Sequence, residues 1–141
     1  MKRWIVMGLW PFLLAACATP TPPAAALYLQ LGGPEGIHAI AQKTLTRVST
    51  DARSARTFKG IKMPYLIDSV SRHLCKVADG PCNYEGETMQ RAHADLNIAG
   101  SEFEFMVAVL REELDAAGVS QSAKNELLRR LAPTKTDIVK R

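Results

Sequence analysis

The chain has few of the residues that most often act as metal ligands or catalytic groups, with three cysteines and three histidines among 141 residues. No internal repeat is visible, and no stretch convincingly shows the pattern that predicts a β-strand. Lysines and arginines are scattered, and the formal net charge of +4 is a mild excess. No basic block therefore indicates nucleic-acid binding. The absence of strand patterns leaves a helical domain to be tested against the spacing of apolar residues.

The N-terminus is arranged like a targeting segment. Two cations precede an apolar run, Trp4–Leu14, and small residues then lead to Cys17. This order is typical of a cleaved signal peptide, and the run is too short for a membrane-spanning helix. The letters LAAC, at 14–17, resemble a bacterial lipobox, in which Cys17 is acylated and becomes the first mature residue. We predict a lipoprotein signal peptide over residues 1–16; the alternative is an ordinary leader with Cys17 uninvolved.

Removal of residues 1–16 leaves 125 residues, a length typical of one domain. Residues 17–26 are rich in proline, alanine and threonine and predict an extended linker from lipidated Cys17. The folded domain is expected over residues 27–141. Ala18 stands where enterobacterial lipoproteins carry a retention aspartate, and this resemblance implies a lipid anchor in the outer membrane, on the periplasmic side. Acyl chains would tether the domain without spanning the membrane.

Cys75 and Cys82 would then lie in an oxidising compartment, where disulfides persist. A continuous helix would separate their Cα atoms by about 10 Å, whereas a disulfide needs roughly 4.4–6.8 Å. The chain must therefore turn back, and Gly80-Pro81 offers a break at the right place. Metal binding is the rival interpretation, but two thiols without a nearby histidine or second cysteine pair make a poor zinc site. We predict a disulfide.

Apolar residues recur at helical spacing along most of the remaining chain. Helices are expected over 34–50, 64–77, 87–94, 101–117 and 120–131, of which four are principal. Ser101 and Glu104 have the spacing of a capping box at the start of the fourth. The sequence therefore predicts an all-α domain, a class that says nothing by itself about chemistry.

His93 lies in the stretch MQRAHADLNI, at 89–98, and a histidine in such a place is commonly structural. Other segments accompany it: LYLQLGGPEGI at 27–37, RVSTDARSARTF at 47–58, GPCNYEG at 80–86, and residues 116–139 near the C-terminus. Taken together, in this order and at these spacings, they resemble the group 1 truncated haemoglobins. The resemblance covers about residues 27–139.

The resemblance implies a truncated globin-like two-on-two helical sandwich that encloses haem b, with His93 as the proximal ligand of the iron. Phe58 matches the phenylalanine that packs against the haem face. A ligand histidine should lie beside an apolar slot, with its second nitrogen hydrogen-bonded. The residues expected around the haem are Leu45, Phe58, Leu66, Val70, Leu74, Met89, Ile98, Phe103, Met106, Val107 and Leu110.

The distal side departs from the family's pattern. Many group 1 members donate hydrogen bonds to the gas ligand from a tyrosine and a glutamine, whose positions are occupied here by Leu45 and Val70. Each missing charge-assisted bond forgoes roughly 1.5–3 kcal/mol, or about 10- to 100-fold in affinity. His73 lies three residues past Val70, on the same apolar stripe as Leu66 at the distal gate position. It has three interpretations: a sixth iron ligand, a contact to the gas ligand or water, or a residue that caps the pocket edge or meets a haem propionate.

We therefore expect a haem protein that reversibly binds O₂, CO or NO and is tethered to a membrane in the periplasm. One alternative is a bis-histidine electron-transfer or redox-sensing protein that uses His73 and His93. Another is a helical lipoprotein that has lost haem and acts as an interaction module. NO dioxygenase or peroxidase turnover is weakly indicated, because it needs a reductant that nothing in this chain supplies, and the redox partner is unknown.

Overall fold

The computed structural model describes residues 26–140. The predicted signal peptide, Cys17 and almost all of the linker lie outside the described residues. The elements, in chain order, are α1 (Leu27–Gln30), α2 (Gly33–Thr50), η1 (Ala55–Phe58), α3 (Met63–Val77), α4 (Met89–His93), α5 (Gly100–Ala116), α6 (Gln121–Leu131), η2 (Ala132–Thr134) and α7 (Lys135–Ile138). Over this range the only β-pairing is one isolated bridge, between Ile98 and Val139.

Glycine and proline set the ends of the long helices. Gly32 and Gly33 have φ angles of 86° and 64°, so the chain reverses between α1 and α2 through a conformation that favours glycine. Pro34 follows in the first turn of α2, where its missing N–H costs no helical hydrogen bond. Gly118 has a φ of 72° and follows the C-terminal end of α5, where a left-handed residue commonly terminates a helix.

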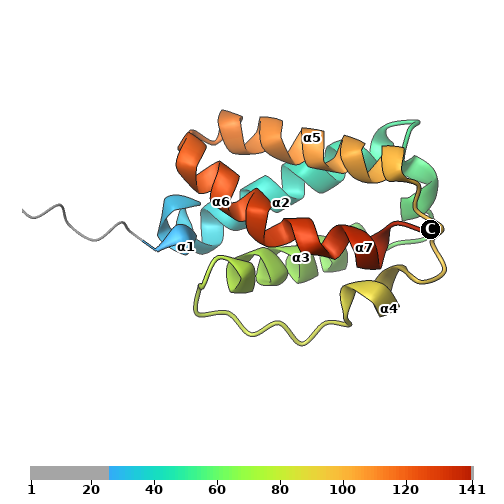
Figure 1. Ribbon diagram of the computed structural model, residues 1–141, viewed down its shortest axis with the longest axis horizontal. Helices are drawn as coiled ribbons and strands as arrows, with labels where there is room; N and C mark the ends of the chain where they lie inside the picture. The colour runs from blue at the N-terminus through green and yellow to red at the C-terminus, as the bar shows by residue number, and fades with distance from the viewer. Residues whose placement is uncertain (1–25, 141) are drawn as a thin grey trace, which may run out of the picture.

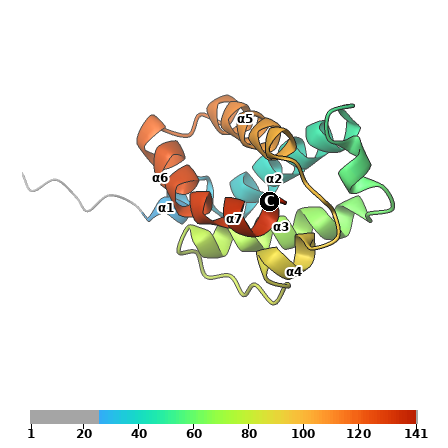
Figure 2. The same ribbon diagram turned by 45° about the vertical axis from the view of Figure 1, so that its right-hand side comes forward.

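Helix α2 is the centre of the fold, because both α3 and α5 pack against it. Figure 1 shows α5 along one side of α2 and α3 along the other, with α6 and α7 closing the arrangement. Figure 2 shows α4 close beside α3, at the end of the molecule where the chain returns to α5. Helix α7 contacts α4, although more than forty residues separate them in sequence.

Two groups of buried apolar side chains hold these helices together. The larger group lies between α1, α2, α3, α5 and α6, and the smaller one, Leu45, Val48, Ile67 and Val109, lies between α2, α3 and α5. Fully burying one aliphatic side chain contributes about 1.5–3 kcal/mol. The smaller group borders the cavity described below, so packing fixes the positions of α2, α3 and α5 around it.

The predicted capping box at Ser101 and Glu104 is wrong. Helix α5 begins at Gly100, with Ala99 as its N-cap residue. The backbone N–H of Ala99 donates to the carboxylate of Glu102, at 2.8 Å. Glu104 instead pairs with Lys135 of α7. Glu102, at the third position of the helix, thus caps its start from within the first turn, and its carboxylate is also held by Arg56 and Thr57 of η1.

A disulfide joins Cys75 of α3 to Cys82, and their Cα atoms are 6.0 Å apart. The chain turns back at Asp79 and Gly80, where the Gly80 N–H donates to the carbonyl of Cys75 at 2.8 Å. A Cβ on Gly80 would lie 2.4 Å from the Tyr28 ring and 2.6 Å from the Cys75 sulfur. Only glycine permits this close return, which ties the end of α3 to the segment that leads to α4.

Candidate functional site

A largely apolar cavity of about 460 Å³ opens between α2, α3, α4, α5 and the C-terminal helices. Its size falls in the range of roughly 300–1,000 Å³ that is typical of small-molecule and cofactor sites. The residues predicted from the sequence to surround a cofactor all line this one cavity: Leu45, Phe58, Leu66, Val70, Leu74, Met89, Ile98, Phe103, Met106, Val107 and Leu110. His73 and His93 line it as well.

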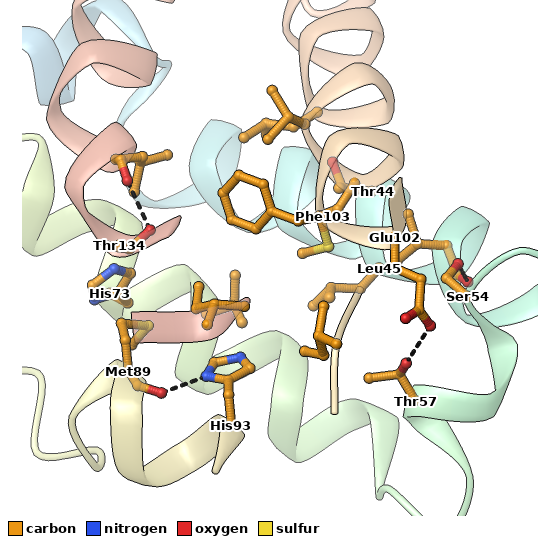
Figure 3. Close-up of a pocket in the computed structure, with 18 of the residues that line it drawn as sticks. Thr44, Leu45, Ser54, Thr57, His73, Met89, His93, Glu102, Phe103 and Thr134 are labelled. Atoms are coloured by element: carbon orange, nitrogen blue, oxygen red, sulfur yellow. Dashed lines mark hydrogen bonds between the residues drawn. The ribbon is translucent and has the colours of Figure 1, made fainter. Parts of the chain in front are cut away.

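His93 is the last residue of α4, and Figure 3 shows its imidazole extending into the pocket. The hydroxyl of Thr88 caps this helix by accepting a bond from the Arg91 N–H, at 3.3 Å. The Nδ1 atom of His93 lies 2.7 Å from the carbonyl oxygen of Met89. Since a carbonyl can only accept, Nδ1 carries the proton and the Nε2 lone pair is left available. This is the tautomer that a metal-ligating histidine adopts.

The opposite wall comes from α2 and α3 and is apolar. Leu45 is 1 % exposed and belongs to the smaller core group, against which Leu66 and Val70 pack. Beside Leu45, the hydroxyl of Thr44 is buried and has no hydrogen-bond partner among the described residues. A second buried hydroxyl near this wall, that of Ser54, is satisfied, because it donates to the carbonyl of Val48 at 2.6 Å. Neither Leu45 nor Val70 carries a polar hydrogen, so neither side chain gives this wall a hydrogen-bond donor.

His73 projects from α3 and is half-buried. Its ring meets that of Tyr84 edge to face, with centroids 5.0 Å apart. Burial lowers the pKa of His73 below its ordinary value, and the nearby charges of Lys76 and His93 lower it further. In the view of Figure 3, His73 lies at the margin of the pocket, on the side of Thr134.

Sequence reasoning missed several residues of the lining. Leu128 and Leu131 of α6 also line the cavity, and their helical spacing could have indicated this. Thr57, in a 3₁₀ turn, and Glu102, at the start of a helix, line the cavity too. Their polar side chains gave no sequence pattern that predicts a pocket lining. The hydroxyl of Thr57 donates to Glu102 at 3.1 Å, as Figure 3 shows. The polar edge of the pocket is therefore decided by tertiary contacts.

Comparison with known proteins identifies the fold and the family. The family model for bacterial-like globins matches residues 26–140. The chain belongs to the bacterial-like globin family. Among its relatives, the group 1 truncated haemoglobin of Nostoc commune is 28% identical over 113 residues, covering 80% of this chain and 96% of the relative. That of Tetrahymena thermophila is 27% identical over 111 residues, covering 79% of this chain and 92% of the relative.

Solved structures agree with this assignment. This globin superposes on the truncated haemoglobin of Tetrahymena pyriformis, in its Fe(III) form, with a TM-score of 0.77 and 25% identity, covering 82% of this chain and 98% of the other. A 2/2 haemoglobin from Synechococcus, with covalently attached haem, shares the fold at the same TM-score of 0.77, with 24% identity, and covers 83% of this chain and 100% of its own. The predicted all-α, two-on-two truncated globin fold is confirmed.

Proposed function

We propose that this globin binds haem b in the apolar pocket, with His93 as the axial iron ligand, and that it reversibly binds O₂, CO or NO. The observation that carries the proposal is the tautomer of His93. Its Nδ1 proton is engaged by the Met89 carbonyl at 2.7 Å, so the Nε2 lone pair is available to a metal. The same side chain reaches into a cavity with a predominantly apolar lining.

The residues present fit a haem group. Phe58 and Phe103 supply aromatic surface to the cavity, and Leu45, Met106 and Val107 supply aliphatic surface, as a flat apolar macrocycle requires. When bound, haem iron supplies the gas-binding position, and the protein tunes it through the axial ligand and the polarity of the pocket. The relatives named above are truncated haemoglobins, which supports the same cofactor here.

The apolar distal wall determines how firmly a gas ligand would be held. Leu45 and Val70 carry no polar hydrogen and cannot stabilise partial negative charge on a ligand. We therefore expect ready release of O₂ and weak discrimination against CO, because each absent charge-assisted bond is worth roughly 1.5–3 kcal/mol. A storage or transport role that needs tight O₂ retention is disfavoured by this wall.

The deciding experiment is an absorption spectrum of the mature protein with haem, in the ferric state, after reduction, and then under CO and O₂. A ferrous-CO spectrum that His93→Ala abolishes would establish the ligand. The matched control is His38→Ala, because His38 is exposed on α2 and does not line the cavity. An unchanged CO spectrum in His93→Ala, or loss of the spectrum in both variants alike, would overturn the assignment of His93.

A second function has one observation in its favour. His73 lines the same cavity, and burial keeps its imidazole neutral and able to ligate at neutral pH. Paired axial histidines would make the protein an electron-transfer or redox-sensing haem protein. Low-spin bands before any gas is added, lost in His73→Leu, would establish this alternative. Failure of the purified protein to carry or take up haem would instead favour a haem-less interaction module.

We also propose that the mature chain is lipidated at Cys17 and anchored on the periplasmic side, at the outer membrane, with residues 17–26 as a tether. The support is the LAAC sequence that ends the apolar N-terminal run. Within residues 26–140, no helix is long and apolar enough to cross a membrane. Labelling with a radioactive fatty acid, compared between the native chain and Cys17→Ser, tests the anchor, and equal labelling of both would refute it.

A further inference from the structure

Helix α4 carries His93 and contributes little to its own stability, although α7 contacts it. It spans Met89–His93 and buries none of its own residues. So short a helix is marginal in water, because the cost of nucleation is shared by very few hydrogen bonds. The orientation of His93 therefore depends on what holds α4 from outside, which is α7 beside it and the groups at its two ends. On the N-terminal side, the Tyr84 hydroxyl donates to the carbonyl of Glu87 at 3.0 Å, just before the helix begins.

The segment that follows α4 is held by one arginine from a distant part of the chain. Arg56 of η1 donates to the carbonyl of Leu96 at 3.2 Å and to that of Asn97 at 3.0 Å. Its guanidinium also pairs with the carboxylate of Glu102 in the first turn of α5. One side chain thus joins η1, the loop after His93 and the start of α5. The planar fork of arginine suits it to this, since lysine could not direct donors to three acceptors in the same way.

Glu102 completes this arrangement, which we call the Arg56–Glu102 hub. The carboxylate is 9% exposed and borders the cavity. It accepts bonds from the Ala99 N–H at 2.8 Å and the Thr57 hydroxyl at 3.1 Å, besides its pairing with Arg56. Burial raises the pKa of Glu102, but these donors outweigh burial and hold the pKa below its ordinary value. The carboxylate is therefore ionised at neutral pH.

The C-terminal segment holds the same loop from its other side. The Lys140 N–H donates to the carbonyl of Ile98 at 3.0 Å, and the Lys140 ammonium donates to the side chain of Asn97 at 2.7 Å. Asn97 itself has a φ of 48°, a left-handed conformation that a loop under these constraints adopts at a cost. The turn between His93 and α5 is thus fixed by side chains that lie far away in sequence.

We propose that the Arg56–Glu102 hub is a positioning device for His93, acting through the Leu96–Ala99 loop to set how the imidazole is presented in the pocket. The inference rests on the proposed function of His93. Neither Arg56 nor Glu102 is placed in contact with a gas ligand by this proposal. Their role is to keep a marginal helix in one orientation.

The test compares Arg56→Gln with Arg130→Gln. Arg130 is a matched control, because it also joins distant segments, donating to the carbonyl of Val77 at 2.7 Å and to Asp79 at 2.6 Å. Its side chain is 27% exposed against 56% for Arg56, so a purely structural effect should be at least as large in the control. Arg130 does not line the cavity.

The first measurement is amide hydrogen exchange on the protein as purified. Arg56→Gln is expected to speed exchange across residues 89–97 at least about tenfold, the factor that follows from losing one hydrogen bond to a charged group. Arg130→Gln should leave those amides unchanged. Equal exchange of residues 89–97 in the two variants would overturn the proposal. This readout does not require haem.

The second measurement is the iron–histidine stretching band of the reduced, haem-loaded protein. Arg56→Gln should shift or broaden this band, and Arg56→Lys should not restore it, whereas Arg130→Gln should match the native protein. A band unchanged in Arg56→Gln overturns the positioning role even if the loop is loosened. If Arg56→Gln does not fold, Thr57→Val, which removes one donor to Glu102, replaces it in both measurements. The proposed function is tested separately. Loss of the band in His93→Ala supports it, and absence of haem from the native protein contradicts it.

Discussion

The distal wall of the pocket is formed by the long helices α2 and α3, whereas the proximal wall is formed by α4, which buries none of its residues. Leu45, Val48 and Ile67 hold the distal wall by burying apolar surface. The proximal wall is held by polar contacts at its ends, from Thr88, Tyr84 and the Arg56–Glu102 hub. Long helices can be fixed by their own packing, but a single turn depends on contacts made by the residues and helices around it, here including α7.

The difference has a consequence for how each wall responds to substitution. Apolar packing is non-directional, so substitutions in the distal wall can change the polarity of the pocket without changing the fold. Hydrogen bonds are directional, so the loss of one donor near α4 changes the orientation of His93. We expect tuning of gas affinity from the distal side and tuning of the axial ligand from the proximal side.

The largest effect is expected from giving the distal wall a donor. Leu45→Tyr should slow O₂ dissociation by about 10- to 100-fold, because a hydroxyl would stabilise partial negative charge on the ligand. Leu45→Phe is the control, since it adds the same ring without the hydroxyl. Stopped-flow release of O₂ measures the rates. Equal rates in the two variants would show that position 45 does not reach the ligand.

The disulfide is the covalent connection between the two walls, because it joins α3 to the segment that leads to α4. Replacing both Cys75 and Cys82 with alanine should lower the free energy of unfolding by about 2.5 kcal/mol, from the entropy of the loop that the bond closes. Guanidinium unfolding measures this change. Reduced native protein should unfold like the double variant, and a gap between the two would indicate that the substitutions act through packing instead.

The buried hydroxyl of Thr44 has no hydrogen-bond partner within residues 26–140 and lies at the distal wall, and its removal should stabilise the protein. Thr44→Val keeps the shape and removes a buried donor without a partner, so the free energy of unfolding should rise by about 1 kcal/mol. Ser54→Ala is the opposite case, because that hydroxyl donates to the Val48 carbonyl at 2.6 Å, and its loss should destabilise. Thermal or urea unfolding compares them, and destabilisation by Thr44→Val would show that its hydroxyl has a partner in solution.

The smallest effect concerns the pH dependence of stability at the pocket margin. The folded-state pKa of His73 lies below its ordinary value of 6.5, first because of burial and then because of Lys76 and His93. The unfolded chain therefore binds this proton more readily, and stability should decrease as the pH falls below about 6.5. Urea unfolding between pH 8 and 5.5 should show a shallower decrease in His73→Leu than in the native protein. Parallel curves would contradict the burial of His73.

Much of the pocket could be predicted from the sequence, because helical periodicity identifies buried faces. Leu66, Val70 and Leu74 recur on one face of α3, and the structure places them on the cavity. The turn at Gly80-Pro81 likewise predicted where the chain folds back between the two cysteines. Such features depend on residues within about one helical turn of each other, and local contacts are what a sequence pattern records.

What only the tertiary structure decided is the polar support of the proximal wall. Helix α5 begins at Gly100, and the Glu102 carboxylate in its first turn pairs with Arg56, which lies 46 positions earlier in the sequence. The sequence also could not predict the neighbours of His73, or that the Thr44 hydroxyl lacks a partner in the part of the chain that the structure describes, since both depend on which helices meet. A periodic pattern shows which face of a helix is buried. It does not show which polar groups bond to each other across the fold, because that depends on how the helices pack. In this globin's pocket, those contacts help to hold the helix that carries His93.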